Sequence, residues 1–190
     1  MILALVVAVI AAVFGLIRGG SLDALSQTKL RWLPLLFGAL VFQAGFDLWN
    51  PDWLSDTGDL AVLLVSHVAV AVFFALNWKL AGMALAAAGF VLNVIVIAAN
   101  GAMPVSQRAS ELAGLEDVGE LGVKHELLDD GTAVPWLADV IPVPGTGKVV
   151  SLGDVLLAAG IGWLVYRRTT AMDSEDAEEA RPSTPRAASG

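Results

Sequence analysis

The chain has 190 residues, of which 56% are hydrophobic and only 16% are charged, and its mean hydropathy is +0.71. A soluble domain is usually about a quarter charged and less than half apolar, so this composition predicts a membrane protein. The absence of cysteine excludes disulfides, thiolate metal sites and cysteine nucleophiles. The net charge of −8 is less informative, because orientation in a bilayer follows the positions of Lys and Arg near helix ends.

Five apolar runs predict membrane-spanning helices, at 1–17, 32–48, 60–76, 80–99 and 149–166. Each approaches the roughly 20 residues that cross about 30 Å of hydrocarbon, although several are short and would require local thinning of the bilayer. The first run could be mistaken for a signal peptide. It has no basic residue before its apolar stretch and no small-residue cleavage site after it, so an uncleaved span is expected.

Basic residues near the helix ends predict the orientation. They follow the first, third and fifth runs, as Arg18, Lys29, Arg31, Lys79, Arg167 and Arg168. Lys and Arg mark cytoplasmic segments, which places the N-terminus outside and the C-terminus inside. The opposite loop, 49–59, carries three aspartates and no basic residue. The alternative, five buried helices of a soluble protein, accounts less well for this asymmetry and for the tryptophans at the helix ends.

The extracytoplasmic loop 100–148 is expected to be largely irregular and partly helical. It begins with "NGAMPVS", where Gly101 releases the chain from helical geometry and Pro104 prevents the helix from continuing. Ser106 is placed to cap a short amphipathic helix within 106–121. The apolar residues of this helix recur every three positions, as Leu112, Leu115, Val118 and Leu121.

Two further segments complete the organisation of the chain. Residues 129–147 contain more apolar side chains than a solvated loop normally holds, which predicts that they pack back on the membrane surface or the helix ends. Residues 169–190 are polar, of mixed charge and without aromatic side chains. They are predicted to form a disordered cytoplasmic tail, so that residues 1–168 make up the transmembrane domain.

Ionisable and amide side chains inside hydrocarbon are the best indicators of function in such a chain. A rise of about 1.5 Å per residue places four of them in one layer, roughly 8–12 Å below the outer surface, and two more at outer helix ends. These candidate ligand-binding residues are Gln43, His67, Asn93 and Asp154 in the layer, with Asp47 and Asn100 at the ends.

Structural roles compete with binding at each of these positions. Asn93 and Gln43 could form hydrogen bonds between helices. His67 could be a structural histidine, and Asp47 could be solvated at a helix end. "SLGD" (151–154) fits a capping box in which Ser151 is the N-cap, which is as good an explanation of Asp154 as a functional one. Small residues recur every three or four positions beside them, as Gly82, Ala86 and Gly89 and as Ala158 and Gly162, which predicts close helix packing.

No catalytic residue, metal site or cofactor is expected. "HELLDD" (125–130) contains possible metal ligands, but its spacing matches neither an H-E-x-x-H helix nor a calcium loop. "PGTGKVV" (144–150) lacks both the first glycine and the hydroxyl residue of a phosphate-binding loop.

Four stretches together resemble a known family. They are "RGGSLDALSQTKLRW" (18–32), "NGAMPVS" (100–106), "KHELLDDGTAVPWLADVIPVP" (124–144) and "VVSLGDVLLAAG" (149–160). They are similar to domain of unknown function 5317, a family of small bacterial membrane proteins, over most of residues 1–168. The resemblance implies an integral membrane protein and brings no activity, cofactor or catalytic residue with it.

The sequence therefore predicts an all-α membrane protein, a bundle of five transmembrane helices in the bacterial plasma membrane. The leading functional hypothesis is a non-enzymatic accessory or binding protein. It would act in the lipid bilayer through a membrane-protein partner or as a homo-oligomer, by its small-residue helix faces, and not on nucleic acid. The alternative is a membrane-embedded enzyme or carrier that handles a small or lipid-like ligand in the outward-facing polar layer.

Overall fold

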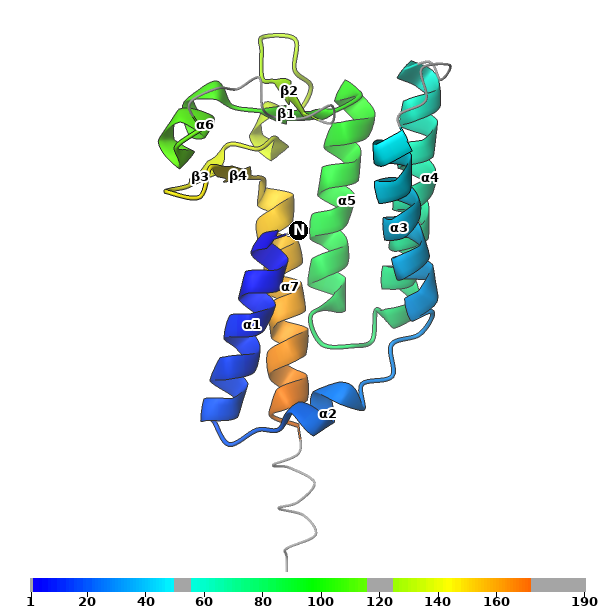
Figure 1. Ribbon diagram of the computed structural model, residues 1–190, viewed down its shortest axis with the longest axis vertical. Coiled ribbons are helices and arrows are strands. Elements are labelled where there is room, and N and C mark those ends of the chain that lie inside the picture. Colours follow the sequence, from blue (N-terminus) through cyan, green and yellow to red (C-terminus); the bar gives the residue numbers. More distant parts are fainter. Residues whose placement is uncertain (1, 50–55, 116–124, 172–190) are drawn as a thin grey trace, which may run out of the picture.

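Five long helices dominate the computed structural model, which describes residues 2–49, 56–115 and 125–171 (Figure 1). They are α1 (Ile2–Ile17), α3 (Leu33–Trp49), α4 (Asp56–Asn77), α5 (Met83–Asn100) and α7 (Leu152–Thr169). Each apolar run that was predicted to be helical is a helix, with ends that differ by a few residues. The largest differences are at α4, which begins four residues earlier than predicted, and at α5 and α7, which each begin three residues later.

The lengths and compositions of these helices bear on membrane insertion. Met83–Asn100 is the one helix in the described part of the chain that is both long and apolar enough to cross a bilayer, and shorter apolar helices cover Leu3–Ile17, Leu33–Phe46 and Leu64–Asn77. At about 1.5 Å per residue, the 16 residues of α1 and the 17 of α3 extend roughly 24–26 Å. The helical architecture is therefore established, and membrane crossing by all five helices remains a proposal.

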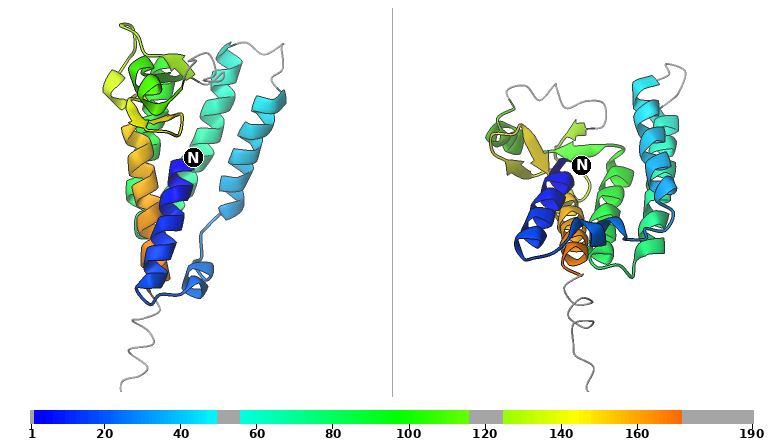
Figure 2. Two further views of the ribbon diagram at one scale, coloured as in Figure 1. Left: turned by 60° about the vertical axis from the view of Figure 1, so that its left-hand side comes forward. Right: turned by 60° about the horizontal axis from the view of Figure 1, so that its bottom comes forward.

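Helix α7 lies between α1 and α5, and glycines bring its backbone close to both neighbours (Figures 1 and 2). A Cβ on Gly160 would meet the backbone of Gly82 and Ala86 in α5, and a Cβ on Gly162 would meet the side chain of Val7 in α1. Gly82 also has φ +81° at the start of α5, a conformation that side chains disfavour. The predicted small-residue packing is confirmed for α5 and α7.

Helices α3 and α4 form an antiparallel pair on the other side of α5 (Figure 1). Larger side chains fill this part of the core, where Val70, Phe73 and Phe74 of α4 are buried with Ala39 of α3. The two sides of the molecule are thus packed differently: glycine contacts join α1, α5 and α7, whereas aromatic and branched side chains join α3, α4 and α5.

The segment between α5 and α7 contains strands that the sequence did not predict. Strand β1 (Met103–Val105) pairs in parallel with β2 (His125–Leu127), and β3 (Ile141–Val143) pairs antiparallel with β4 (Lys148–Val150). A 3-10 turn, η2 (Pro135–Leu137), lies between the two sheets. The strands were missed because each is three residues long, too short to show an alternating pattern. This segment, 101–151, is called the cap below.

Helix α6 (Gln107–Ala113) begins where it was expected, because the Ser106 side chain accepts a hydrogen bond from the Ala109 amide at 3.3 Å. The helix ends at Ala113, so Leu115 of the predicted stripe lies beyond it. Leu112 is 60% exposed, and Ala109, Ser110 and Ala113 are buried instead, because the small residues fit under the β3–β4 hairpin. Val118 and Leu121 of the predicted stripe lie outside the described residues.

Segment α2 (Leu22–Ser26) follows α1 and contacts the end of α7. The Ser21 amide donates to the carbonyl oxygen of Thr169 at 2.8 Å, and Thr169 is fully buried. Thr169 therefore belongs to the helical domain and not to the tail that was predicted from this residue onward. Residues 172–190 of that tail lie outside the described residues.

Candidate functional site

Three side chains of the predicted polar layer form a hydrogen-bonded cluster between α5 and α7. Asn93 donates from Nδ2 to Oδ1 of Asp154 at 2.8 Å, and the Ser151 hydroxyl donates to Oδ1 of Asn93 at 2.8 Å. Ser151 also caps α7, because its hydroxyl oxygen accepts the amide hydrogen of Asp154 at 2.9 Å. Ser151 is fully buried, and the other two side chains are half-buried.

Local sequence explains how these groups meet. Ser151 follows strand β4 and precedes α7, and its backbone is extended, which is the geometry of an N-cap. Gly89 lies one turn before Asn93, and a Cβ there would meet the α7 backbone at Gly153. The two helices therefore approach closely enough for the short side chain of Asn93 to reach both Ser151 and Asp154. The predicted N-cap at Ser151 is confirmed, and the Asp154 side chain contacts α5 through Asn93.

The cap supplies a fourth polar residue, Asp139, which was not among the predicted site residues. It is 95% buried, with a relative exposure of 5%. Its amide donates to the carbonyl oxygen of Pro104, and its carbonyl oxygen accepts from the amide of Ser106, both at 2.9 Å. Burial, together with the charge of Asp154, raises the pKa of Asp139 to about 7. The sequence carried one weak signal for it, an isolated acid among the apolar residues of 136–143.

Asn100 fastens the cap to the end of α5 instead of joining the cluster. Its Oδ1 accepts the amide hydrogen of Ala133 at 2.7 Å, and its Nδ2 donates to the carbonyl oxygens of Ala133 at 3.0 Å and Val96 at 2.8 Å. All its strong hydrogen-bonding groups are thus engaged by backbone. The expectation that residues 129–147 pack back on the helix ends is confirmed at this point.

The remaining predicted residues are not joined to the cluster by hydrogen bonds between described residues. His67 stacks on Phe90 with ring centroids 5.3 Å apart, and its Nδ1 lies 3.5 Å from the hydroxyl oxygen of Ser66. Gln43 is half-buried on α3. The side chain of Asp47 lies outside the described part of the structure. The predicted single layer therefore divides into a cluster between α5 and α7 and a histidine between α4 and α5.

The chemistry available to the cluster is hydrogen bonding and charge. The charge of Asp154 at the start of α7 acts on Asp139 in the cap, and Asn93 and Ser151 supply the neutral donors. No group of three or more His, Asp or Glu side chains in the described residues could hold a metal ion. The arrangement suits a structural link, or recognition of a small polar group.

Comparisons with known proteins agree with the sequence resemblance. The model of a family of unknown function, DUF5317, matches residues 27–166. An "Uncharacterized protein" of Thermotoga maritima is 35% identical over 101 residues, which cover 51% of this chain and 58% of that protein. The chain thus spans little more than half the length of this relative. No solved structure matches. Since the family model covers well over half of the chain, the protein belongs to the DUF5317 family.

Proposed function

We propose that the protein is an integral membrane protein of the bacterial plasma membrane, with its N-terminus outside and its C-terminus in the cytoplasm. The observation that carries this proposal is the distribution of side chains about the helices. Large apolar residues point outward, with exposures of 66% at Leu5, 69% at Val41 and 65% at Val65, while Asn93, Ser151 and Asn77 bond between elements. This pattern is the reverse of that in water and is expected in hydrocarbon.

Labelling of single cysteines tests the location, because the chain has no native cysteine. Thr146→Cys lies in the cap, and Lys79→Cys lies in the turn between α4 and α5, at the opposite ends of the helices. A membrane-impermeant maleimide is expected to label the first on intact cells and the second only after permeabilisation. Reversed labelling would contradict the orientation, and recovery of the chain from a detergent-free soluble fraction would contradict membrane insertion.

Within the membrane, we propose an accessory or binding role through self-association or a membrane-protein partner. The small residues of α5 and α7 are already used against each other, so they are not available for such contacts. Helix α3 offers a different face: Gly38 and Gly45 are seven residues apart, nothing lies within 4 Å of a Cβ placed on either, and the neighbouring Phe37 is 58% exposed. Glycines on an open helix face permit close approach of another helix.

Association through α3 can be measured by cross-linking and co-purification from membranes. Gly38→Leu should reduce the cross-linked or co-purified fraction by fivefold or more, because the added side chain holds a neighbouring helix away. Ala84→Leu is the matched control, since Ala84 is exposed on α5, and it should leave the fraction unchanged. A monomeric, partner-free protein would contradict this role.

A second candidate function is a carrier or enzyme for a small or lipid-like ligand, and the electrostatic effect of Asp154 at the start of α7 on the buried Asp139 of the cap favours it. Co-purification of a small molecule with the intact protein, lost in Asp154→Ala while the protein remains folded, would support this function. The hydrogen bonds that Asn93 makes to its two neighbours favour the accessory role, because they occupy the cluster with its own side chains.

A further inference from the structure

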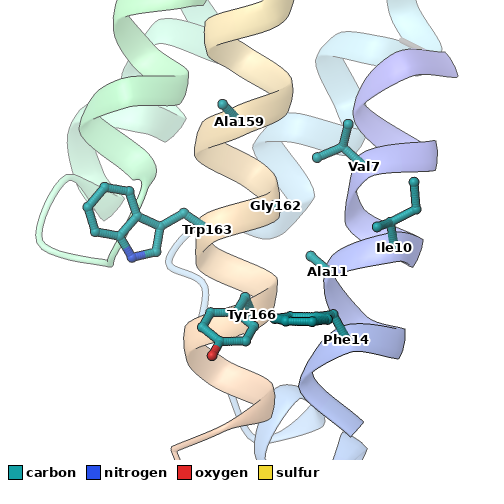
Figure 3. Close-up of a pocket in the computed structure, with 8 residues that line it drawn as sticks. All are labelled: Val7, Ile10, Ala11, Phe14, Ala159, Gly162, Trp163 and Tyr166. Carbon is teal, nitrogen blue, oxygen red and sulfur yellow. The ribbon is translucent and has the colours of Figure 1, made fainter. Parts of the chain in front are cut away.

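A shallow apolar groove runs along the face of α7 that is turned away from the cluster. Its volume is about 510 Å³, within the range of clefts that hold small molecules. Ala159 and Gly162 form its floor, side chains of α1 such as Val7 form one wall, and Trp163 forms the other (Figure 3). Gly162 is buried against the Val7 side chain of α1, whereas Ala159 is exposed.

Aromatic rings close the end of the groove near the C-terminus of α7. The rings of Phe14 and Tyr166 lie 5.8 Å apart, one from each helix, and both line the groove (Figure 3). In the proposed orientation this end faces the cytoplasmic interface, where tyrosine and tryptophan are favoured because they present an apolar body and a polar tip.

Each wall continues into an arginine one helical turn further on. Arg18 follows Phe14 by four residues, and its guanidinium lies 5.1 Å from the Phe14 ring centroid. Arg167 follows Trp163 by four residues, so it leaves α7 on the same side as the tryptophan. Both arginines are exposed, and neither forms an ion pair in the described residues. Each wall of the apolar groove is therefore followed, near the C-terminus of α7, by an exposed arginine.

We propose that this groove binds one anionic phospholipid of the cytoplasmic leaflet, with an acyl chain along α7 and the phosphate between Arg18 and Arg167. The inference rests on the proposed membrane location. Charge complementarity selects this occupant, since a neutral lipid or a second copy of the apolar helix face would leave the arginines without a counter-charge. Juxtamembrane basic residues attract anionic lipids in the same way.

Tryptophan quenching in reconstituted vesicles tests the proposal. The full-length protein is placed in phosphatidylcholine vesicles that contain a minor fraction of lipid with brominated acyl chains, either phosphatidylglycerol or phosphatidylcholine. Brominated phosphatidylglycerol should quench several-fold more than its share of the lipid predicts, and Trp163→Phe should remove that excess. Equal quenching by the two lipids would overturn the proposal.

Amino-acid substitutions distinguish the contribution of the two arginines from that of the apolar groove. Arg18→Gln with Arg167→Gln should lower the relative affinity for phosphatidylglycerol about fivefold per arginine and bring quenching down to that of phosphatidylcholine. Ala159→Leu, which fills the floor of the groove without a change of charge, should also lower the affinity for phosphatidylglycerol. Arg31→Gln, at the exposed start of α3, is the matched control and should keep the excess. An unchanged excess in the double variant would overturn the proposal, as would an α1–α7 cross-linked dimer that excludes the lipid.

Flotation of the same vesicles distinguishes failure of the proposed membrane location from failure of the proposed lipid site. Protein that does not float with vesicles would contradict the membrane location itself. Protein that floats but shows no preference for the anionic lipid would contradict only the lipid site.

Discussion

Three asparagines hold the elements of this protein together, and each uses both the oxygen and the nitrogen of its amide. Asn77 accepts from the amide of Arg31 and donates to its carbonyl oxygen, at 2.8 and 2.9 Å, and Asn100 does the same with Ala133. The two residues thus form matching clamps, one at the end of α4 and one at the end of α5. Asn93 links side chains instead of backbone. An asparagine suits these positions because one short side chain carries a donor and an acceptor.

Replacement of Asn93 tests the strength of the cluster. Asn93→Leu leaves the Ser151 hydroxyl and Oδ1 of Asp154 without their partner, and we expect a loss of about 1–3 kcal/mol in the free energy of unfolding. The loss can be measured by denaturant titration of the detergent-solubilised protein, monitored by circular dichroism. Gln43→Leu, on the open side of the bundle, should change stability by less than about 0.5 kcal/mol. Equal effects of the two substitutions would show that the cluster is not a structural link.

Asp139 predicts a dependence of stability on pH. Its pKa in the folded protein is about 7, against about 4 in an unfolded chain, because burial and the charge of Asp154 disfavour the carboxylate, while the amino terminus acts in the opposite direction. The folded state therefore binds more protons between these values. Its stability should be greatest below about pH 4, fall as the pH rises to about 7 by at most ~4 kcal/mol, and stay constant above.

Thermal unfolding between pH 4 and 8 can measure this contribution. Asp139→Asn should flatten the profile and raise the melting temperature at pH 8, since it removes a charge that the folded protein disfavours. Asp129→Asn, at an exposed turn of the cap, should leave the profile unchanged. A wild-type protein that becomes more stable from pH 5 to pH 7 would contradict the assignment to Asp139.

The distance between paired helices in this molecule depends on the size of the residue at their contact. Gly160 lies against backbone atoms of α5, which cannot move aside as a flexible side chain could. Gly38 is on α3 with open space around it. Replacement of glycine by leucine should therefore lower the stability of the protein at position 160 but not at position 38.

Gly160→Leu should force α5 and α7 apart and cost more than about 3 kcal/mol, or prevent folding, because a packed core does not accept added volume. Gly38→Leu should be neutral or slightly stabilising, by up to about 1 kcal/mol, since leucine is the better helix former. Yield of folded protein after membrane extraction, followed by denaturant titration, compares the two. A tolerated Gly160→Leu would contradict the close approach of α5 and α7.

The described part of the molecule has one set of closely packed helices and one helix pair that is less closely joined to it. Helices α1, α5 and α7 form one unit through glycine contacts and the Asn93 cluster, while α3 contacts the rest mainly through α4. Regions with fewer buried contacts open more readily than the remainder of a protein. The bundle is therefore expected to open stepwise and not as one block.

Hydrogen exchange in detergent or nanodiscs can detect this difference. Backbone amides in the middle of α3 should exchange at least tenfold faster than those in the middle of α5 and α7, because the α3–α4 pair can separate without breaking the glycine contacts. The Asn93→Leu variant should reduce this difference in exchange rate, because it weakens the contact between α5 and α7 and so speeds exchange in both. Uniform exchange across all five helices would show that the bundle opens as one unit.

Local sequence properties determined the five helices and the N-cap residues of α6 and α7, Ser106 and Ser151. Apolar runs and N-cap residues act over neighbouring positions, so the sequence shows them directly. Local properties also identified Asn93 and Asp154 as members of one polar layer with Gln43 and His67, since a polar residue among apolar ones is visible in the sequence. Tertiary structure decided the rest. The strands of the cap depend on distant partners, such as Met103 with His125 and Val105 with Asp139, and Asp139 becomes a site residue only when the cap folds over α7. His67 and Asn93 share a depth along their helices, but rotation about the helix axes turns them toward different neighbours, and no spacing in the sequence fixes that rotation.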